Sequence, residues 1–197
     1  MRYVTMLLLG LFVIAPAWGI EQPKTHQDRP DYPRVSLDGL EDLRLGAPLP
    51  AKSTFAGLTY KLFHEPDYDE KGRPTTRTFA KLYHNGFYVG SGMLDSKKRL
   101  VELEITDWRV SFEGHFAPAS TWSHLRAQLP DVKLHYAYNL DALVAESPDL
   151  PGLQVHFDPT LYGTQSKLKG EFTPLALTGI PGSVKATSLR LFWIPLE

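Results

Sequence analysis

The sequence predicts an α+β fold that is mostly antiparallel sheet with one short helix, in a single domain. From Val35 onward, short segments alternate apolar and polar residues, and Gly, Pro, Asn and Asp separate them. Only one stretch has helical spacing. The 197 residues include 12% aromatic side chains and no Cys, which excludes disordered and disulfide-stapled classes. A formal charge of -1 gives no basic excess for binding nucleic acid.

The first 19 residues have the layout of a secretory signal peptide. Arg2 precedes an apolar run from Val4 to Ile14, and Ala17 and Gly19 supply small residues before a cleavage point. The run is shorter than the roughly 20 residues that cross a bilayer. We therefore expect cleavage near Gly19, a periplasmic location and no transmembrane segment.

The mature chain divides into an extended leader, residues 20–34, and one domain, residues 35–197. The leader has three prolines and no apolar periodicity. The absence of Cys excludes a lipid-modified cysteine, a disulfide and a thiolate metal site.

A meander of antiparallel strands is predicted from Leu58 to Phe112. Strands at Leu58–His64 and Phe79–Tyr83 flank a long polar loop, Glu65–Pro74. Asn85-Gly86 suits a type I′ turn, because both residues tolerate positive φ. Leu100–Thr106 alternates cleanly, and Trp108, Val110 and Phe112 continue the alternation.

One helix is expected near Ser120–Leu129, with Ser120 as its N-cap and a proline after it. Its apolar residues Trp122, Leu125 and Leu129 fall on one face. Leu140–Glu146 suits either helix or strand. The remaining predicted strands are Val132–Tyr138, Leu153–Phe157 and Ser188–Ile194, and Trp193 suggests that the C-terminus is tied into the sheet.

A faint internal repeat is a further hypothesis. The segment Leu43–Pro48 and the segment Val110–Pro118 each read as strand, Gly and Pro, about 68 residues apart. A duplicated half-domain would explain both, although a shared Gly and Pro also arises by chance.

The most pointed candidate site lies in the predicted polar loop. Asp67, Asp69 and the following Gly72 resemble the start of a calcium loop, but Lys71 and Thr78 occupy positions that need oxygen ligands. A solvated hairpin tip is the better reading, so no metal is expected. The loop is instead a candidate binding site, comprising His64, Glu65, Asp67, Tyr68, Asp69 and Glu70.

No catalytic or cofactor-binding motif is assembled in the sequence. The seven histidines lack zinc-protease spacing, although His64 and His84 would lie on neighbouring strands. Glu102 and Glu104 share one strand face as candidate paired carboxylates, and solvent exposure is the simpler interpretation. The aromatic residues, Trp108 among them, are numerous enough for an apolar cavity but sit at core spacing.

The chain resembles the sigma-E-regulated envelope lipoprotein family, whose function is undefined. The matching features are Gly46, Pro48, Asn85-Gly86, the strand Leu100–Ile105 and the aromatic end Leu189–Trp193. The resemblance implies a mixed β fold in the envelope and assigns no catalytic residue. This chain lacks the lipid-carrying cysteine of that family.

These observations predict an exported, non-catalytic binding or interaction protein of the cell envelope, without a cofactor. Its expected partner is an envelope protein or an apolar ligand. One alternative is an inhibitor or immunity protein that blocks an enzyme through the acidic loop. Another is a hydrolase whose site is assembled from distant segments.

Overall fold

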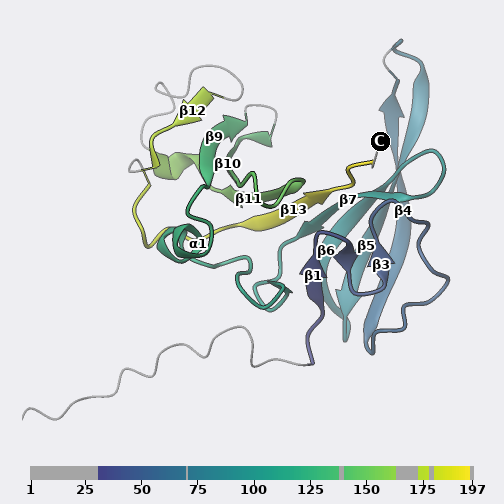
Figure 1. Cartoon of the computed structure of the whole chain (residues 1–197). Coiled ribbons are helices and arrows are strands. Elements are labelled where there is room, and N and C mark those ends of the chain that lie inside the picture. The colour runs from purple at the N-terminus through teal and green to yellow at the C-terminus, as the bar shows by residue number, and fades with distance from the viewer. Residues whose placement is uncertain (1–30, 70, 138–139, 163–172, 178–179, 196–197) are drawn as a thin grey trace, which may run out of the picture.

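The computed structural model describes residues 31–69, 71–137, 140–162, 173–177 and 180–195. Most of them form a nine-stranded antiparallel sheet in the order β12-β9-β10-β11-β13-β7-β6-β5-β4 (Figure 1). Its strands are β4 (Leu58–Tyr68), β5 (Pro74–His84), β6 (Phe87–Leu94), β7 (Leu100–Ile105), β9 (Lys133–Ala137), β10 (Ala142–Glu146), β11 (Leu153–Phe157), β12 (Thr173–Leu175) and β13 (Ser188–Phe192).

A second, small sheet in the order β3-β2-β1-β8 packs on the large one. Its strands are β1 (Arg34–Ser36), β2 (Gly39–Leu40), β3 (Leu43–Arg44) and β8 (Ser111–Phe112). The described residues also include one α-helix, α1 (Trp122–Gln128), and a short 3₁₀ helix, Pro159–Tyr162. The predicted antiparallel sheet with a single short helix is thus confirmed for this part of the chain. The α+β label fits loosely, because α1 has only seven residues.

The core lies on one face of the large sheet. Fully buried Leu82, Leu103 and Leu189 on that face pack in one cluster with Val35 of the small sheet and Trp122 of α1. Strand alternation explains this, since every second side chain points to the same face. No described helix has the length and hydrophobicity needed to cross a bilayer.

The predicted hairpin at Asn85-Gly86 is confirmed. It joins β5 to β6 with φ of 49° at Asn85 and 83° at Gly86, as a type I′ turn requires. The ambiguous segment Leu140–Glu146 contains strand β10, paired with β9 and β11. The C-terminus is held as expected, because the Trp193 N–H donates to the carbonyl of Val101.

The predicted polar loop Glu65–Pro74 is wrong at both ends, where Glu65–Tyr68 and Pro74 belong to strands. β4 continues to Tyr68 and pairs there with Pro74, so only a short turn remains. The carboxylate of Asp69 closes this turn. It accepts hydrogen bonds from the backbone N–H of Lys71 and from that of Arg73, each at 2.9 Å. Cross-strand pairing therefore extends a loop-like sequence into strand.

Two other boundaries also differ from the prediction. β7 ends at Ile105, and the Arg109 N–H donates to the Asp107 carboxylate at 2.9 Å, which turns the chain toward the small sheet. Trp108 is consequently 48% exposed and outside any strand. The N-cap of α1 is Thr121, not Ser120, whose hydroxyl instead accepts from the Ala117 N–H at 2.9 Å.

The strand order indicates an internal repeat. β4-β5-β6-β7 and β9-β10-β11-β13 are four-stranded meanders, and their last strands β7 and β13 pair at the centre of the sheet. In each half, a short segment before the meander bridges to the chain that leads into the last strand. The bridges are Pro48 with Arg99 and Thr121 with Lys185.

The backbone hydrogen bonds fix how the halves correspond. Gly46 N–H donates to Leu100 O at 2.7 Å, and Ala119 N–H donates to Ala186 O at 2.8 Å. Gly46 and Ala119 also share a positive φ, 77° and 70°. The repeat hypothesis is supported, but the offset here is 73 residues rather than 68, and Gly46 matches Ala119 rather than Gly114.

The central strands obey the symmetry of this repeat. With Leu100 equivalent to Ala186, Leu103 corresponds to Leu189 and Ile105 to Leu191. These residues pair crosswise, Leu103 with Leu191 and Ile105 with Leu189. A pseudo-two-fold axis therefore passes between β7 and β13.

Candidate binding surface

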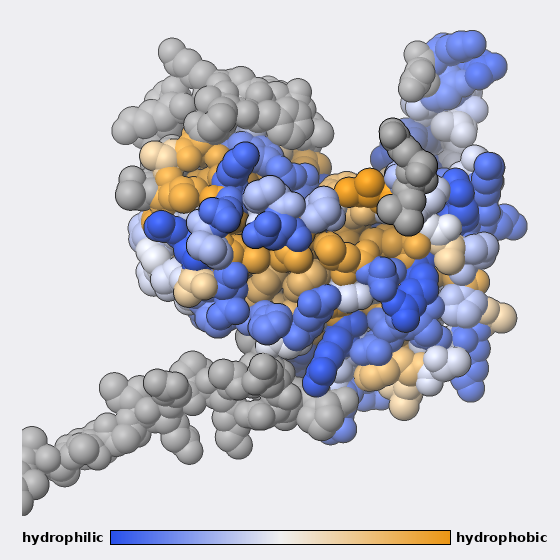
Figure 2. All heavy atoms as spheres, viewed as in Figure 1, coloured by the Kyte–Doolittle hydropathy of each residue, from blue (hydrophilic) through white to orange (hydrophobic). Residues whose placement is uncertain are grey.

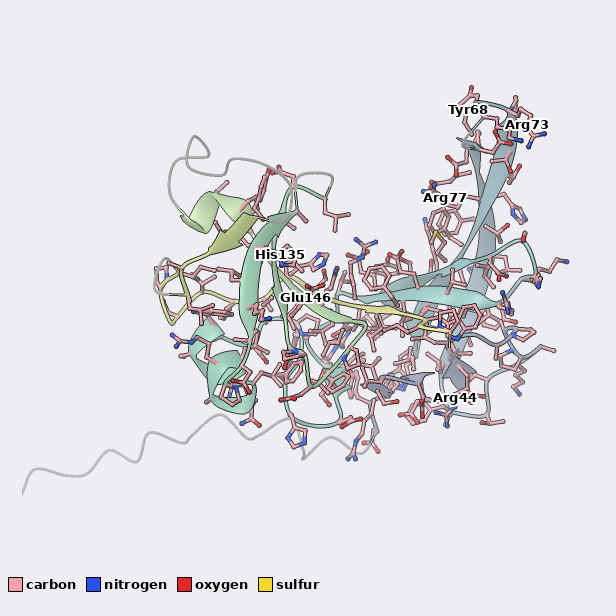
Figure 3. The ribbon with its side chains drawn as sticks, turned by 45° about the horizontal axis from the view of Figure 1, so that its top comes forward. Arg44, Tyr68, Arg73, Arg77, His135 and Glu146 are labelled. Atoms are coloured by element: carbon pink, nitrogen blue, oxygen red, sulfur yellow. The ribbon has the colours of Figure 1, made fainter. Side chains whose placement is uncertain are left out.

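The β4–β5 hairpin projects beyond the rest of the sheet as an arm, which we define as residues 61–81 (Figure 1). Its tip carries Tyr68 and Arg73, with Arg77 further down (Figure 3). Leu62 and Tyr68 are 53% and 69% exposed. Six binding residues were predicted, and the five that the structure describes all lie in the arm; the sixth, Glu70, lies outside the described residues.

The two faces of the arm differ in charge. Alternation places Leu62, His64, Pro66 and Tyr68 on one face, opposite Thr78, Thr76 and Pro74 of β5. The other face carries Glu65, Asp67 and Arg77 beside a stacked pair, Phe63 and Phe79, with ring centroids 5.2 Å apart. The first face has no Asp, Glu, Lys or Arg, so it suits a partner that removes it from water.

Two carboxylates of the arm, Asp67 and Asp69, are already paired with arginines. Asp67 lies 2.7 Å from the Arg77 guanidinium and Asp69 lies 2.6 Å from that of Arg73. Hydrogen bonds from the Arg73 side chain and backbone lower the pKa of Asp69. A calcium ion would have to displace these guanidinium groups, which agrees with the reading of a hairpin tip rather than a calcium loop.

His64 and His84 do not converge. His84 pairs with Leu58, six residues from His64 along β4, which places them roughly 20 Å apart at about 3.3 Å per residue. The Nδ1 of His64 is hydrogen-bonded at 3.0 Å to the hydroxyl of Thr78. Within the described parts of the chain, no group of three potential metal ligands is present.

Glu102 is not the solvated residue that the sequence suggests. Its side chain is 16% exposed and pairs with Arg190 of β13. The alternation of β7 agrees with the prediction, but β13 lies beside β7 in the same sheet and brings Arg190 onto the same face as Glu102. Only the tertiary pairing of the two half-repeats produces this contact.

A partly buried polar network lies beside Arg190 in the second half. His156 Nε2 donates to Gln154 at 3.2 Å, and the Gln154 amide donates to Glu146 at 2.7 Å. His135 Nδ1 lies 3.7 Å from Glu146 (Figure 3). Burial, aided by the charges of Arg190 and His135, lowers the pKa of His156 to about 4.

The chemistry of this network is limited. An amide occupies the place beside His156 where a hydrolytic triad has a carboxylate. A pKa near 4 also makes His156 a weak base at neutral pH. The network is better suited to holding β10, β11 and β13 together than to proton transfer.

Several exposed aromatic side chains lie at the end of the sheet opposite the arm tip. Phe87, Tyr88 and Trp108 are 59%, 46% and 48% exposed. The Arg109 guanidinium lies over the rings of Phe87 and Tyr32, at 5.0 and 5.1 Å from their centroids. Sequence reasoning placed Trp108 in the core and missed this group; the Asp107-Trp108-Arg109 sequence after the strand was the available signal.

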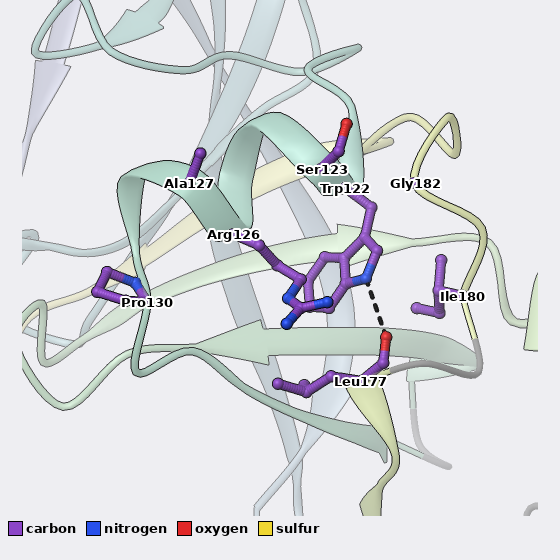
Figure 4. A pocket seen from close by; sticks show the side chains of 8 residues that line it. All are labelled: Trp122, Ser123, Arg126, Ala127, Pro130, Leu177, Ile180 and Gly182. Carbon is purple, nitrogen blue, oxygen red and sulfur yellow. Dashed lines mark hydrogen bonds between the residues drawn. The ribbon is translucent and has the colours of Figure 1, made fainter.

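A shallow groove of about 410 Å³ runs beside α1 (Figure 4). The ring of Trp122 lines this groove, and its indole N–H donates to the carbonyl of Leu177 at 3.2 Å. Arg126 stacks on the same ring, 5.9 Å from its centroid. Figure 2 shows a separate band of hydrophobic residues along the middle of the molecule, where β13 crosses between the halves, and hydrophilic residues over the arm tip.

Comparison with known proteins shows the fold alone. The sequence matches no protein-family model and no curated protein at a significant level. The structure is similar to the crystal structure of the uncharacterized protein yfeY from Escherichia coli, with a TM-score of 0.52 and 11% sequence identity. The match covers 81% of this chain and 99% of that chain.

Proposed function

We propose that this protein is an exported, non-catalytic binding protein of the cell envelope, and that the arm is its contact element. The observation that carries the proposal is the uncharged face of the arm, with Leu62 and Tyr68 exposed at its surface. A projecting uncharged face with large exposed side chains, on an ordered hairpin, is typical of an interaction site.

Several features make the arm suitable for binding. Its eleven-residue strands are fully paired, and its carboxylates Asp67 and Asp69 are neutralised by Arg77 and Arg73. The hairpin is thus ordered before it meets a partner, which reduces the entropy lost on binding. The partner surface expected from this chemistry is apolar and uncharged, with acceptors for the Tyr68 hydroxyl.

Site-specific photo-cross-linking in the native host tests this role. A photoreactive phenylalanine at Tyr68 should yield a cross-linked envelope protein, and the same group at exposed Asp131 should not. Cross-linking at both positions to the same products, or at neither, would contradict the proposal.

The location is part of the proposal. The apolar run of the first 19 residues and the resemblance to envelope lipoproteins support export to the periplasm. Intact-mass measurement of protein released by osmotic shock should give a chain that begins near Ile20. Recovery of the full 197 residues from the cytoplasm would overturn it.

An inhibitor or immunity protein is the second candidate, because a projecting hairpin has the shape to enter an enzyme cleft. The partner cross-linked at position 68 distinguishes the two functions. If that partner is an enzyme, its activity should fall on addition of this protein and recover when the arm is removed.

A further inference from the structure

The two halves of the large sheet differ in whether their first strand is covered by a further strand. β9 occupies the same place in its half-repeat as β4 does in the first half, and β9 is covered by β12. β4 has no strand on its outer side among the described residues. An open edge of eleven residues is long for a soluble protein, since its unpaired backbone groups attract another strand.

The hydrogen bonds at the two ends of β4 show which groups face outward. Asn85 N–H donates to Gly57 O at 2.9 Å, and Asp69 N–H donates to Arg73 O at 3.0 Å. Odd-numbered residues of β4 therefore bond to β5, and even-numbered residues direct their backbone groups to the open edge. Tyr60, Leu62, His64 and Tyr68 offer donors there, and Pro66 offers only its carbonyl.

β4 is complementary to itself when it runs antiparallel to a second copy with Phe63 opposite Phe63. In this register, outward-facing Leu62 and His64 exchange backbone hydrogen bonds across the two-fold axis. Lys61 lies opposite Glu65 of the second copy, and this happens twice. The phenylalanine pair lies on the axis between the two ion pairs.

The surroundings of Lys61 favour a carboxylate on its open side. Lys61 pairs directly with Lys81 of β5, and like charges opposite one another are destabilising. Glu65 from a second copy would lie on the other side of Lys61 and offset this repulsion. Neither Lys61 nor Glu65 forms an ion pair of its own among the described residues.

Neighbouring registers are worse. A shift by two residues in one direction places Lys61 opposite Asp67, which is already bound to Arg77, and Phe63 opposite Glu65. A shift in the other direction places Lys61 opposite Phe63 and Glu65 opposite Thr59. A shift by one residue moves each side chain to the wrong face.

We propose that this protein forms a two-fold symmetric dimer through antiparallel pairing of β4 with β4 of a second copy, centred on Phe63, with Lys61–Glu65 ion pairs on both sides of the axis. The large sheets of the two copies then become continuous, and their arms lie side by side. The proposal goes beyond the proposed function, because it concerns the edge of the arm and not its uncharged face.

Charge exchange tests the register. Analytical ultracentrifugation of the mature protein should give twice the chain mass. Lys61→Glu and Glu65→Lys should each weaken dimerisation by roughly tenfold or more, since each puts like charges opposite one another twice. The double variant K61E/E65K should dimerise again, and an equimolar mixture of the two single variants should form a heterodimer.

Lys97→Glu is the matched control, since it changes the same charge on an exposed turn away from β4. It should leave the dimer unchanged. A wild type that is monomeric at its highest soluble concentration overturns the proposal, as do single variants that dimerise like the wild type. Single variants that stay monomeric when mixed, while their circular dichroism shows a native fold, contradict the Lys61–Glu65 register. The cross-linking test at Tyr68 is separate, because a dimer product is recognised by its doubled mass.

Discussion

The two half-repeats share a strand order but differ in the length and covering of their outer hairpin. In the first half, β4 and β5 have eleven residues each and project as the arm. In the second, β9 and β10 have five residues each and β12 covers the edge. The same meander thus yields a projecting surface in one half and a covered one in the other, and strand length decides which.

The halves also differ just after Gly46 and Ala119, the two positions that correspond most closely. With an offset of 73 residues, Trp122 is the counterpart of Leu49. Trp122 is 1% exposed, begins α1 and packs edge-on against Phe157 at 5.5 Å, whereas Leu49 is only partly buried. The second half uses its helix where the first half uses an irregular connection.

The largest expected effect comes from removing that helix anchor. Trp122→Ala should lower the free energy of unfolding by about 4 kcal/mol, because it opens a cavity and leaves the Leu177 carbonyl without its donor. Leu49→Ala should cost about 1–2 kcal/mol. Chemical denaturation of both variants measures the difference, and equal losses would mean that the halves do not differ here.

The shared positive φ allows a second comparison. Gly46→Ala should destabilise the protein by about 3 kcal/mol, because φ is 77° and the new methyl group would overlap the Trp193 ring. Ala119→Gly should stabilise it by about 1 kcal/mol, since φ there is 70°. Thermal unfolding checks both signs; destabilisation by the glycine variant would contradict the proposed equivalence.

The buried network of the second half should make stability depend on pH. The pKa of His156 is lowered to about 4 by burial, so the unfolded chain binds a proton below about 6.5 that the folded chain takes up only near 4. Stability should therefore fall as the pH drops from 6.5 to 4, by up to about 3 kcal/mol.

His156→Gln should flatten this dependence over the same window. Denaturation of both proteins at several pH values between 4 and 7 measures the slopes. Below pH 4, Asp107 adds a further loss in both proteins: although burial raises its pKa, hydrogen bonds from Arg109 outweigh this and keep the pKa low. Equal slopes between pH 4 and 6.5 would show that His156 is not the responsible group.

The smallest effect is expected from shortening the arm. Glu65 and Arg77 are directly opposite in a hydrogen-bonded pair of the hairpin, so an Asn-Gly turn can replace residues 66–76. The removed residues are mostly exposed, and stability should change by less than about 1 kcal/mol, or roughly 2–4 °C in Tm. A larger loss would show that the arm supports the core.

Local patterns in the sequence determined several elements in both halves. Three elements could be predicted from neighbouring residues alone. They are the Asn85-Gly86 turn, the strand Leu100–Ile105 and the helix that contains Trp122 and Leu125. Each depends on a local backbone conformation or a local apolar period, and not on a distant segment. The exposure of the segment from His64 to Asp69 could also be predicted from its polar residues, but its place in β4 could not, and its role in binding stays a proposal.

Pairing between distant segments decided the rest. Glu102 looks like a surface residue until β13 brings Arg190 beside it, 88 positions along the chain. Gly46 and Ala119 look unrelated in sequence, and only matching hydrogen bonds and positive φ angles make them equivalent. The sequence by itself determined where most of the strands lie and which face of each is apolar, because these follow from local periodicity. Which strands lie side by side, where the arm leaves the sheet and which edge stays open were decided by the tertiary structure, because strand pairing depends on residues that are far apart in the chain.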